Sequence, residues 1–127
     1  MRALTVPIRG ATHPNKRGPT RTFGIALCAP GDPVELRPEP TNHKDQNAIA
    51  IYERGGIMLG YVPAEKCQWL QSTMARGVEL FAIFQAASEH GGFIRIGFDH
   101  VPTLPEPPPA RDRFDEDFPP DPIWDDE

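Results

Sequence analysis

The sequence predicts a mainly β domain with one or two short helices, built as a small barrel or sandwich. Turn-forming residues recur at intervals of about eight to twelve residues through the central part of the chain, which is typical of these folds. Glycine pairs at 55–56 and 91–92 permit the positive φ angles that tight hairpin turns require. We expect six strands, over residues 22–28, 34–37, 47–53, 57–62, 78–87 and 92–99.

One helix is predicted over residues 63–76. Cys67, Leu70 and Met74 recur at helical spacing, so they would face the core together. Pro63 suits the first turn of a helix, and Gly77 suits the position just after its end. A chain of 127 residues is expected to form one domain.

Charge is segregated along the chain. The net charge is −5, but residues 1–22 carry +5 with no acidic residue, residues 23–100 carry −3, and residues 101–127 carry −7. Residues 10–20 are rich in Gly, Pro and polar residues, and residues from 101 onward hold eight of the 16 prolines. We therefore expect a flexible basic arm at 1–19, a folded domain at 20–101, and a disordered acidic tail at 102–127.

Several function classes are disfavoured by what the sequence lacks. Cys28 and Cys67 have neither zinc nor redox spacing, and the four histidines are scattered. No apolar run has the length of a signal peptide or of a membrane span, and there is no phosphate-binding loop of the nucleotide-hydrolase type. The expectation is a cytoplasmic monomer that is not an enzyme and needs no cofactor or metal.

The most informative segment runs from Val34 to Gly77. It contains a strand that ends in a basic residue, an acid-proline pair, an Asn with an Asp three residues later, an Asn-Ala-Ile strand opening, and a Gly-aromatic-hydrophobic turn into a helix. These elements are Arg37, Glu39-Pro40, Asn42, Asp45, Asn47-Ala48-Ile49 and Gly60-Tyr61-Val62. In this order they resemble the HIRAN domain family, the DNA-binding domain of the helicase-like transcription factor type.

The resemblance implies an OB-like barrel that binds DNA and captures the 3′ end of a single strand. Asp45 would accept a hydrogen bond from a 3′-hydroxyl and repel a 3′-phosphate, and Asn42 would donate to the terminal phosphodiester. Tyr61, Tyr52 and Phe23 are candidates for stacking on bases. The expected partners are single-stranded DNA or DNA 3′ ends, together with a separate helicase or repair protein.

Four basic residues complete the candidate nucleic-acid site: Arg21, Arg37, Lys44 and Lys66. The family places a basic residue and two successive aromatics on its first strand, and we match these to the segment Arg21-Thr22-Phe23-Gly24, which has one aromatic. The family also has a lysine at the start of the helix, where this chain has Ala64 and then Lys66 two residues later.

The sequence also permits other interpretations. Asn42 and Asp45 are also residues that simply build turns. The protein would act as an interaction adaptor if its acidic tail, with Phe114, Phe118 and Trp124, docked a partner. The same tail would otherwise be solubilising, or autoinhibitory by lying over a basic groove. A hydrolase is disfavoured because the sequence offers no catalytic site.

Overall fold

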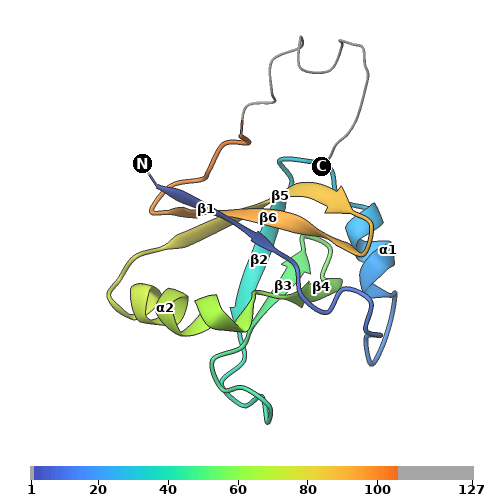
Figure 1. Cartoon of the computed structure of the whole chain (residues 1–127), viewed down its shortest axis with the longest axis horizontal. Coiled ribbons are helices and arrows are strands. Elements are labelled where there is room, and N and C mark those ends of the chain that lie inside the picture. The colour runs from blue at the N-terminus through green and yellow to red at the C-terminus, as the bar shows by residue number, and fades with distance from the viewer. Residues whose placement is uncertain (1, 106–127) are drawn as a thin grey trace.

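The computed structural model describes residues 2–105 and consists of a strongly curled antiparallel sheet with two helices (Figure 1). The strands follow the sheet order β1-β6-β5-β2-β3-β4, which leaves β1 and β4 as the two edges. The mainly β prediction is confirmed. The elements are β1 (Ala3–Pro7), α1 (Arg21–Ala26), β2 (Pro33–Pro38), β3 (Ile49–Glu53), β4 (Met58–Tyr61), α2 (Ala64–Ala75), β5 (Leu80–Ser88) and β6 (Gly91–Phe98).

The two edges of the sheet meet just after β1. The backbone N–H of Arg9 donates to the Tyr61 carbonyl at 2.8 Å, and the N–H of Tyr61 donates to the Arg9 carbonyl at 2.8 Å. Gly60 permits this approach: its φ is +150°, and a Cβ added there would lie 2.5 Å from the Arg9 oxygen. The curled sheet is therefore joined edge to edge at one antiparallel residue pair. This pair closes the curl into a half-barrel.

The hydrophobic core fills the inside of the curl. Inward-facing residues alternate along the strands, as in Val6 on β1 and Ile94 and Ile96 on β6. Helix α2 packs over the core with Cys67 and Leu70, both of which are buried. It ends where Gly77, at φ +96°, donates its N–H to the Met74 carbonyl at 2.9 Å. The helix predicted over 63–76 is thus confirmed to within one residue at each end.

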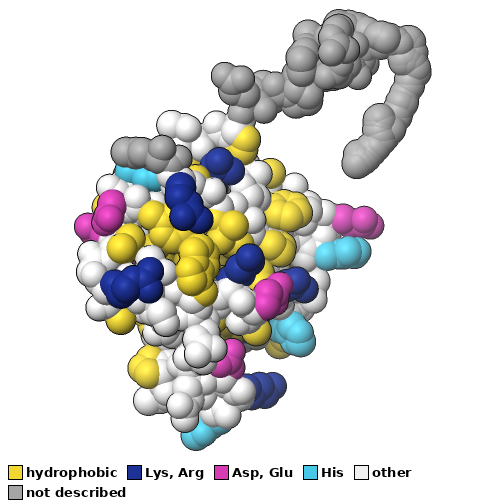
Figure 2. Space-filling view, turned by 60° about the vertical axis from the view of Figure 1, so that its left-hand side comes forward, with side chains coloured by type: hydrophobic (Ala, Val, Ile, Leu, Met, Phe, Trp, Pro, Cys, Tyr) yellow, Lys and Arg dark blue, Asp and Glu magenta, His cyan; other side chains and the backbone are white. Residues whose placement is uncertain are grey.

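Some apolar side chains reach the surface. Trp69 on α2 is 42% exposed, and its ring centroid lies 5.5 Å from that of Phe98. Figure 2 shows hydrophobic side chains gathered in the middle of one face, with Lys and Arg side chains around them. Neither described helix is long and apolar enough to cross a membrane.

The strand predicted at residues 22–28 is wrong, because this segment forms helix α1. Thr20 caps the helix, since its Oγ1 accepts a hydrogen bond from the Phe23 N–H at 3.0 Å. Gly24 allows α1 to pack closely on β4, where an added Cβ would lie 2.7 Å from side-chain atoms of Ile57 and Leu59. A short apolar run fits either a strand or a helix, so periodicity alone did not separate the two.

The predicted flexible arm at 1–19 also needs correction, because β1 belongs to the sheet. It pairs with β6 over five residue pairs, from Ala3↔Gly97 to Pro7↔Phe93. The alternation of apolar residues at 4, 6 and 8 is a strand pattern that the neighbouring Arg and Pro residues obscured. The predicted number of six strands is right, with the first at 3–7 instead of 22–28, and the domain starts before residue 20.

The remaining strands match their predicted ranges within two residues at each end. The β3–β4 turn contains Gly56 at φ +99°, as expected. The β5–β6 turn lies instead at residues 89–90, and Gly91 and Gly92 are strand residues without positive φ. Glycine is required here because a side chain would not fit: a Cβ on Gly92 would lie 2.8 Å from the Ala86 oxygen. Of the predicted tail, residues 106–127 lie outside the described residues.

Replacing Gly60 with Ala should destabilise the protein because the new Cβ meets the Arg9 carbonyl and separates the two sheet edges. We expect a loss of about 3 kcal/mol or more in the free energy of unfolding, measured by urea denaturation. Gly77→Ala is the matched control: its φ is +96° but nothing lies within 4 Å of the added Cβ. That change should cost only about 1–2 kcal/mol. Equal losses for both variants would contradict the role assigned to Gly60.

Candidate nucleic-acid interface

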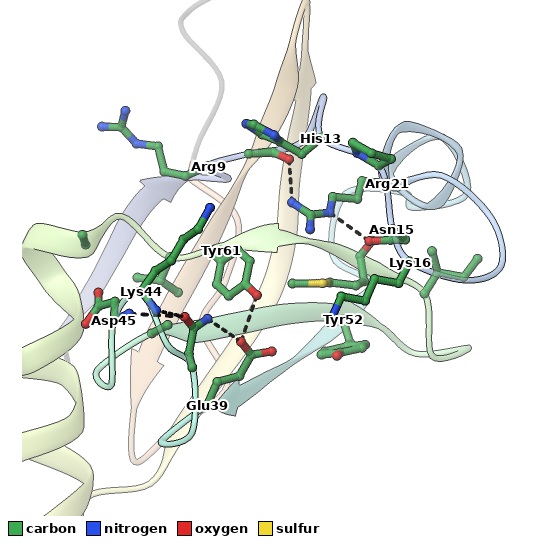
Figure 3. A pocket seen from close by; sticks show the side chains of 18 of the residues that line it. Arg9, His13, Asn15, Lys16, Arg21, Glu39, Lys44, Asp45, Tyr52 and Tyr61 are labelled. Atoms are coloured by element: carbon green, nitrogen blue, oxygen red, sulfur yellow. Dashed lines mark hydrogen bonds between the residues drawn. The ribbon is translucent and has the colours of Figure 1, made fainter.

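A groove with a volume of about 1330 Å³ lies where the edges of the sheet meet (Figure 3). One wall is the segment 9–21, and the opposite wall is the β2–β3 loop at 39–48. Tyr52 of β3 and Tyr61 of β4 line it between these walls, and Ala64 and Glu65 at the start of α2 border one end. The position of the groove is therefore set by the closure between Arg9 and Tyr61.

The β2–β3 loop is ordered by its own side chains. Asn42 Oδ1 accepts hydrogen bonds from the backbone N–H groups of Lys44, at 2.9 Å, and Asp45, at 3.2 Å. Asp45 Oδ1 accepts in turn from the Asn47 N–H at 2.9 Å. These are turns in which an Asn or Asp side chain bonds the backbone two or three residues on, which is the structural role of these residue types. The Asp45 side chain uses one carboxylate oxygen in this way while it lines the groove.

Glu39 links the loop to the sheet. Its Oε1 accepts a hydrogen bond from the Tyr61 hydroxyl at 2.9 Å and another from Asn42 Nδ2 at 3.0 Å. Burial, with the Glu39 carboxylate as a further cause, raises the pKa of Tyr61 to about 12. Tyr61 is therefore a neutral donor at ordinary pH, and its ring is held in one position in the groove.

Arg21 has a different role from the one predicted. Its Nε donates to Asn15 Oδ1 at 2.8 Å, and its Nη1 donates to the Gly10 carbonyl at 2.8 Å. The guanidinium carbon lies 5.7 Å from the centroid of the Tyr61 ring. Arg21 lines the groove but chiefly anchors the 10–20 loop to the sheet.

The groove is more basic than acidic. Basic side chains that line it come from residues 9, 16, 17, 21 and 44, and acidic ones from residues 39, 45 and 65. Arg9 pairs with Glu65 across 3.7 Å, with both side chains mostly exposed. Two histidines, at positions 13 and 43, also line the groove. A polyanion would meet a net positive wall there.

The structure brings six of the nine predicted site residues to the groove and leaves three outside its lining. Those in the groove are Asn42, Asp45, Tyr61, Arg21, Lys44 and Tyr52.

The three predicted residues outside the groove lie at separate places. Phe23 is on α1 and is 51% exposed. Arg37 lies over the Tyr52 ring, 3.9 Å from its centroid, and pairs with Glu35 across 3.0 Å, so that it supports Tyr52 from outside the groove lining. This ion pair lowers the pKa of the Glu35 carboxyl. Lys66 lies on α2.

The residues that the prediction missed come mainly from the segment taken for a flexible arm. They are Arg9, His13, Asn15, Lys16, Arg17 and, from the β2–β3 loop, Glu39.

For Arg9, Lys16 and Arg17 the signal was present as the excess of positive charge in residues 1–22, of which only Arg21 was assigned to the site. Because the first strand is β1, residues 21–24 lie on helix α1 and not on a strand.

The described residues give no support for a metal or thiol site. Among residues 2–105, no three His, Cys, Asp or Glu side chains are grouped closely enough to hold a metal ion. Burial raises the pKa of the Cys67 thiol, and burial with nearby carboxylates raises that of Cys28 to about 11. Both thiols therefore stay protonated and weakly nucleophilic at neutral pH.

The position of Tyr61 makes a spectroscopic prediction. The chain has two tyrosines, so the alkaline absorbance titration of the wild-type protein minus that of Tyr61→Phe isolates Tyr61. We expect its midpoint near pH 12. Because the folded-state pKa lies above that of the unfolded chain, the stability that depends on neutral Tyr61 is complete below about pH 10 and is lost between about pH 10 and 12. A midpoint near pH 10 would rule out the partly buried hydrogen bond to Glu39.

Two solved structures resemble this fold. A protein from Lactobacillus plantarum matches with a TM-score of 0.64 and 22% sequence identity, covering 77% of this chain and 95% of that chain. The HIRAN domain of human HLTF matches with a TM-score of 0.60 and 17% identity, covering 76% of this chain and 74% of that chain. At these identities the likeness establishes the fold. No curated protein sequence matches the chain.

The family assignment comes from the sequence of the folded domain. Residues 7–100 match the family model described as the HIRAN domain, so the match begins at the end of β1 and extends just past β6. It includes both walls of the groove. The chain belongs to the HIRAN domain family, and this membership supports a nucleic-acid-binding module.

Proposed function

We propose that the groove binds single-stranded DNA with a free 3′ end placed at Asp45. The observation that carries the proposal is the combination of aromatic side chains, basic walls and the Asp45 carboxylate in a single groove. Aromatic rings stack on bases without sequence preference, and basic side chains attract the phosphates. Processing of DNA ends in repair or at replication forks is the setting in which such ends arise.

Asp45 is suited to select a hydroxyl end. Its Oδ1 is engaged by the Asn47 N–H, and this bond orients the carboxylate at the groove. A carboxylate accepts a hydrogen bond from a 3′-hydroxyl but repels a 3′-phosphate. Asn42 Oδ1 already accepts two backbone hydrogen bonds and its Nδ2 donates once to Glu39, so one amide hydrogen is left for a terminal phosphodiester.

We propose a binding role in place of a catalytic one. The Glu39 carboxylate is engaged by Tyr61 and Asn42, and Asp45 is engaged by its own loop. The raised pKa of the Cys67 thiol disfavours nucleophilic chemistry at this edge of the groove.

The alternative of a protein-interaction adaptor depends on tail residues that lie outside the described ones. Nucleic-acid binding predicts a steep loss of affinity with salt, which a contact centred on tail aromatics does not.

Asp45→Asn should abolish the preference for hydroxyl ends while the protein still folds. The amide oxygen of Asn can still accept from the Asn47 N–H, so the turn is kept and only the charge is removed. We expect the wild-type protein to prefer 3′-hydroxyl over 3′-phosphate strands by roughly 10- to 100-fold, and the variant to bind both alike. Fluorescence-polarisation titrations of labelled single strands, each at 50 and 200 mM salt, measure this.

The matched control is Glu89→Gln, which removes an acidic charge at the β5–β6 turn, outside the groove lining. This variant should keep the wild-type preference for hydroxyl ends. The salt dependence of binding to hydroxyl-ended strands should be almost unchanged in Asp45→Asn. The reason is that the salt dependence comes from contacts to phosphates, whereas Asp45 is proposed to contact the 3′-hydroxyl. A preference that survives in Asp45→Asn would assign this residue to the turn alone.

A further inference from the structure

The 10–20 loop is built as a fixed wall of the groove. Ala11 at its start is 3% exposed and belongs to the core, where it sits against Gly91. Asn15 in its middle donates through Nδ2 to the Pro19 carbonyl at 3.0 Å and to the Met58 carbonyl of β4 at 3.1 Å. With the two hydrogen bonds from Arg21, these contacts fasten the loop to the sheet at several points. A segment with so many anchors can present side chains in a defined position.

The tip of this loop presents two positive charges. Lys16 and Arg17 are exposed, both line the groove, and neither forms an ion pair within residues 2–105. No acidic residue occurs in residues 1–22 to neutralise them. The Arg21 guanidinium donates through Nε and Nη1 to Asn15 and Gly10, whereas Lys16 and Arg17 donate no side-chain hydrogen bond within residues 2–105 and keep their donors for a ligand.

The tip lies at the opposite end of the groove from Asp45. Figure 3 shows Asp45 beside the start of α2 and Lys16 on the far side, where its side chain extends toward Tyr52. Tyr61 lies between these two ends. A strand whose 3′ end sits at Asp45 and whose bases follow Tyr61 and Tyr52 would therefore bring its upstream phosphates to the tip of the loop.

We propose that the 10–20 loop is a phosphate clamp that binds the DNA backbone several nucleotides upstream of the 3′ end, so that affinity depends on strand length. The inference rests on the proposed function, because it takes the position of the 3′ end from Asp45. Two cations without carboxylate partners suit a row of phosphates, each of which releases condensed counterions when it is neutralised. The loop itself reads no base and selects strands by length and charge.

The test compares 3′-hydroxyl oligothymidylates of about three and about twelve nucleotides, which bracket the shorter binding-site sizes of single-strand-binding folds. For the wild-type protein we expect the longer strand to bind roughly tenfold tighter. In the double variant Lys16→Gln, Arg17→Gln this advantage should disappear. The affinity for the short strand and its preference for a hydroxyl end should stay unchanged. The slope of log affinity against log salt for the long strand should become shallower by about 1.4, or about 0.7 per phosphate.

The double variant Arg2→Gln, Arg76→Gln is the matched control, since it removes the same charge from exposed residues outside the groove lining. It should retain the length dependence. A clamp variant that keeps the full advantage of the longer strand, or a control that loses it equally, would overturn the clamp while leaving the 3′-end site at Asp45 intact. If the wild-type protein shows no preference for hydroxyl ends and binds neither strand, the proposed function fails and the clamp fails with it.

Discussion

The backbone pairing of Arg9 with Tyr61 is the contact on which both the fold and the groove depend. A six-stranded antiparallel sheet with edges β1 and β4 would leave two rows of unpaired backbone groups, which proteins avoid by closing or covering the edges. Here the chain just after β1 reaches β4, and the missing side chain of Gly60 leaves room for it. The same contact brings the basic N-terminal segment beside the aromatic residues of the sheet.

Tyr61 therefore acts in two ways. Its backbone closes the sheet, and its ring and hydroxyl organise the groove through Glu39 and Arg21. Since Glu39 also holds Asn42, a chain of hydrogen bonds runs from the closed edge of the sheet to the turn that carries Asp45. The groove is thus supported by the fold, in the way that a binding site gains specificity when a second layer of residues fixes the first. A strand of DNA would meet side chains that are already in place.

Much of this arrangement could be predicted from the sequence, and the largest error lies in the N-terminal segment. The strands after residue 30 and helix α2 followed from local patterns, because hairpins and amphipathic helices are specified by neighbouring residues. Asn42, Asp45 and Tyr61 followed from the family resemblance and do lie in the groove, as does Lys44, which was predicted as a basic residue of the site. The prediction failed for the N-terminal part, whose strand β1 pairs with residues about 90 positions away in the sequence. Single-sequence periodicity does not report such long-range pairings.

The misjudged N-terminal segment also accounts for the misjudged roles of Arg21 and Phe23. When residues 1–19 are taken for a flexible arm, the first strand is placed at residues 22–28, and Arg21 and Phe23 are expected on a strand although they lie on helix α1. In the structure Arg21 anchors the 10–20 loop, and Lys16 and Arg17 carry the positive charges at its tip. Arg37 and Lys66 were predicted to bind nucleic acid because they are basic and lie near the other candidate residues in the sequence. In the structure each lies outside the groove lining.

The most direct test of the central claim is a two-dimensional NMR titration of the full chain with a short 3′-hydroxyl single strand, following every backbone amide. If the groove is the binding surface, shifts will concentrate in residues 9–21, 42–47 and 60–65 and will spare the β5–β6 turn at 89–90. Shifts confined to the exposed apolar surface around Trp69 and Phe98, with the groove unaffected, would contradict it.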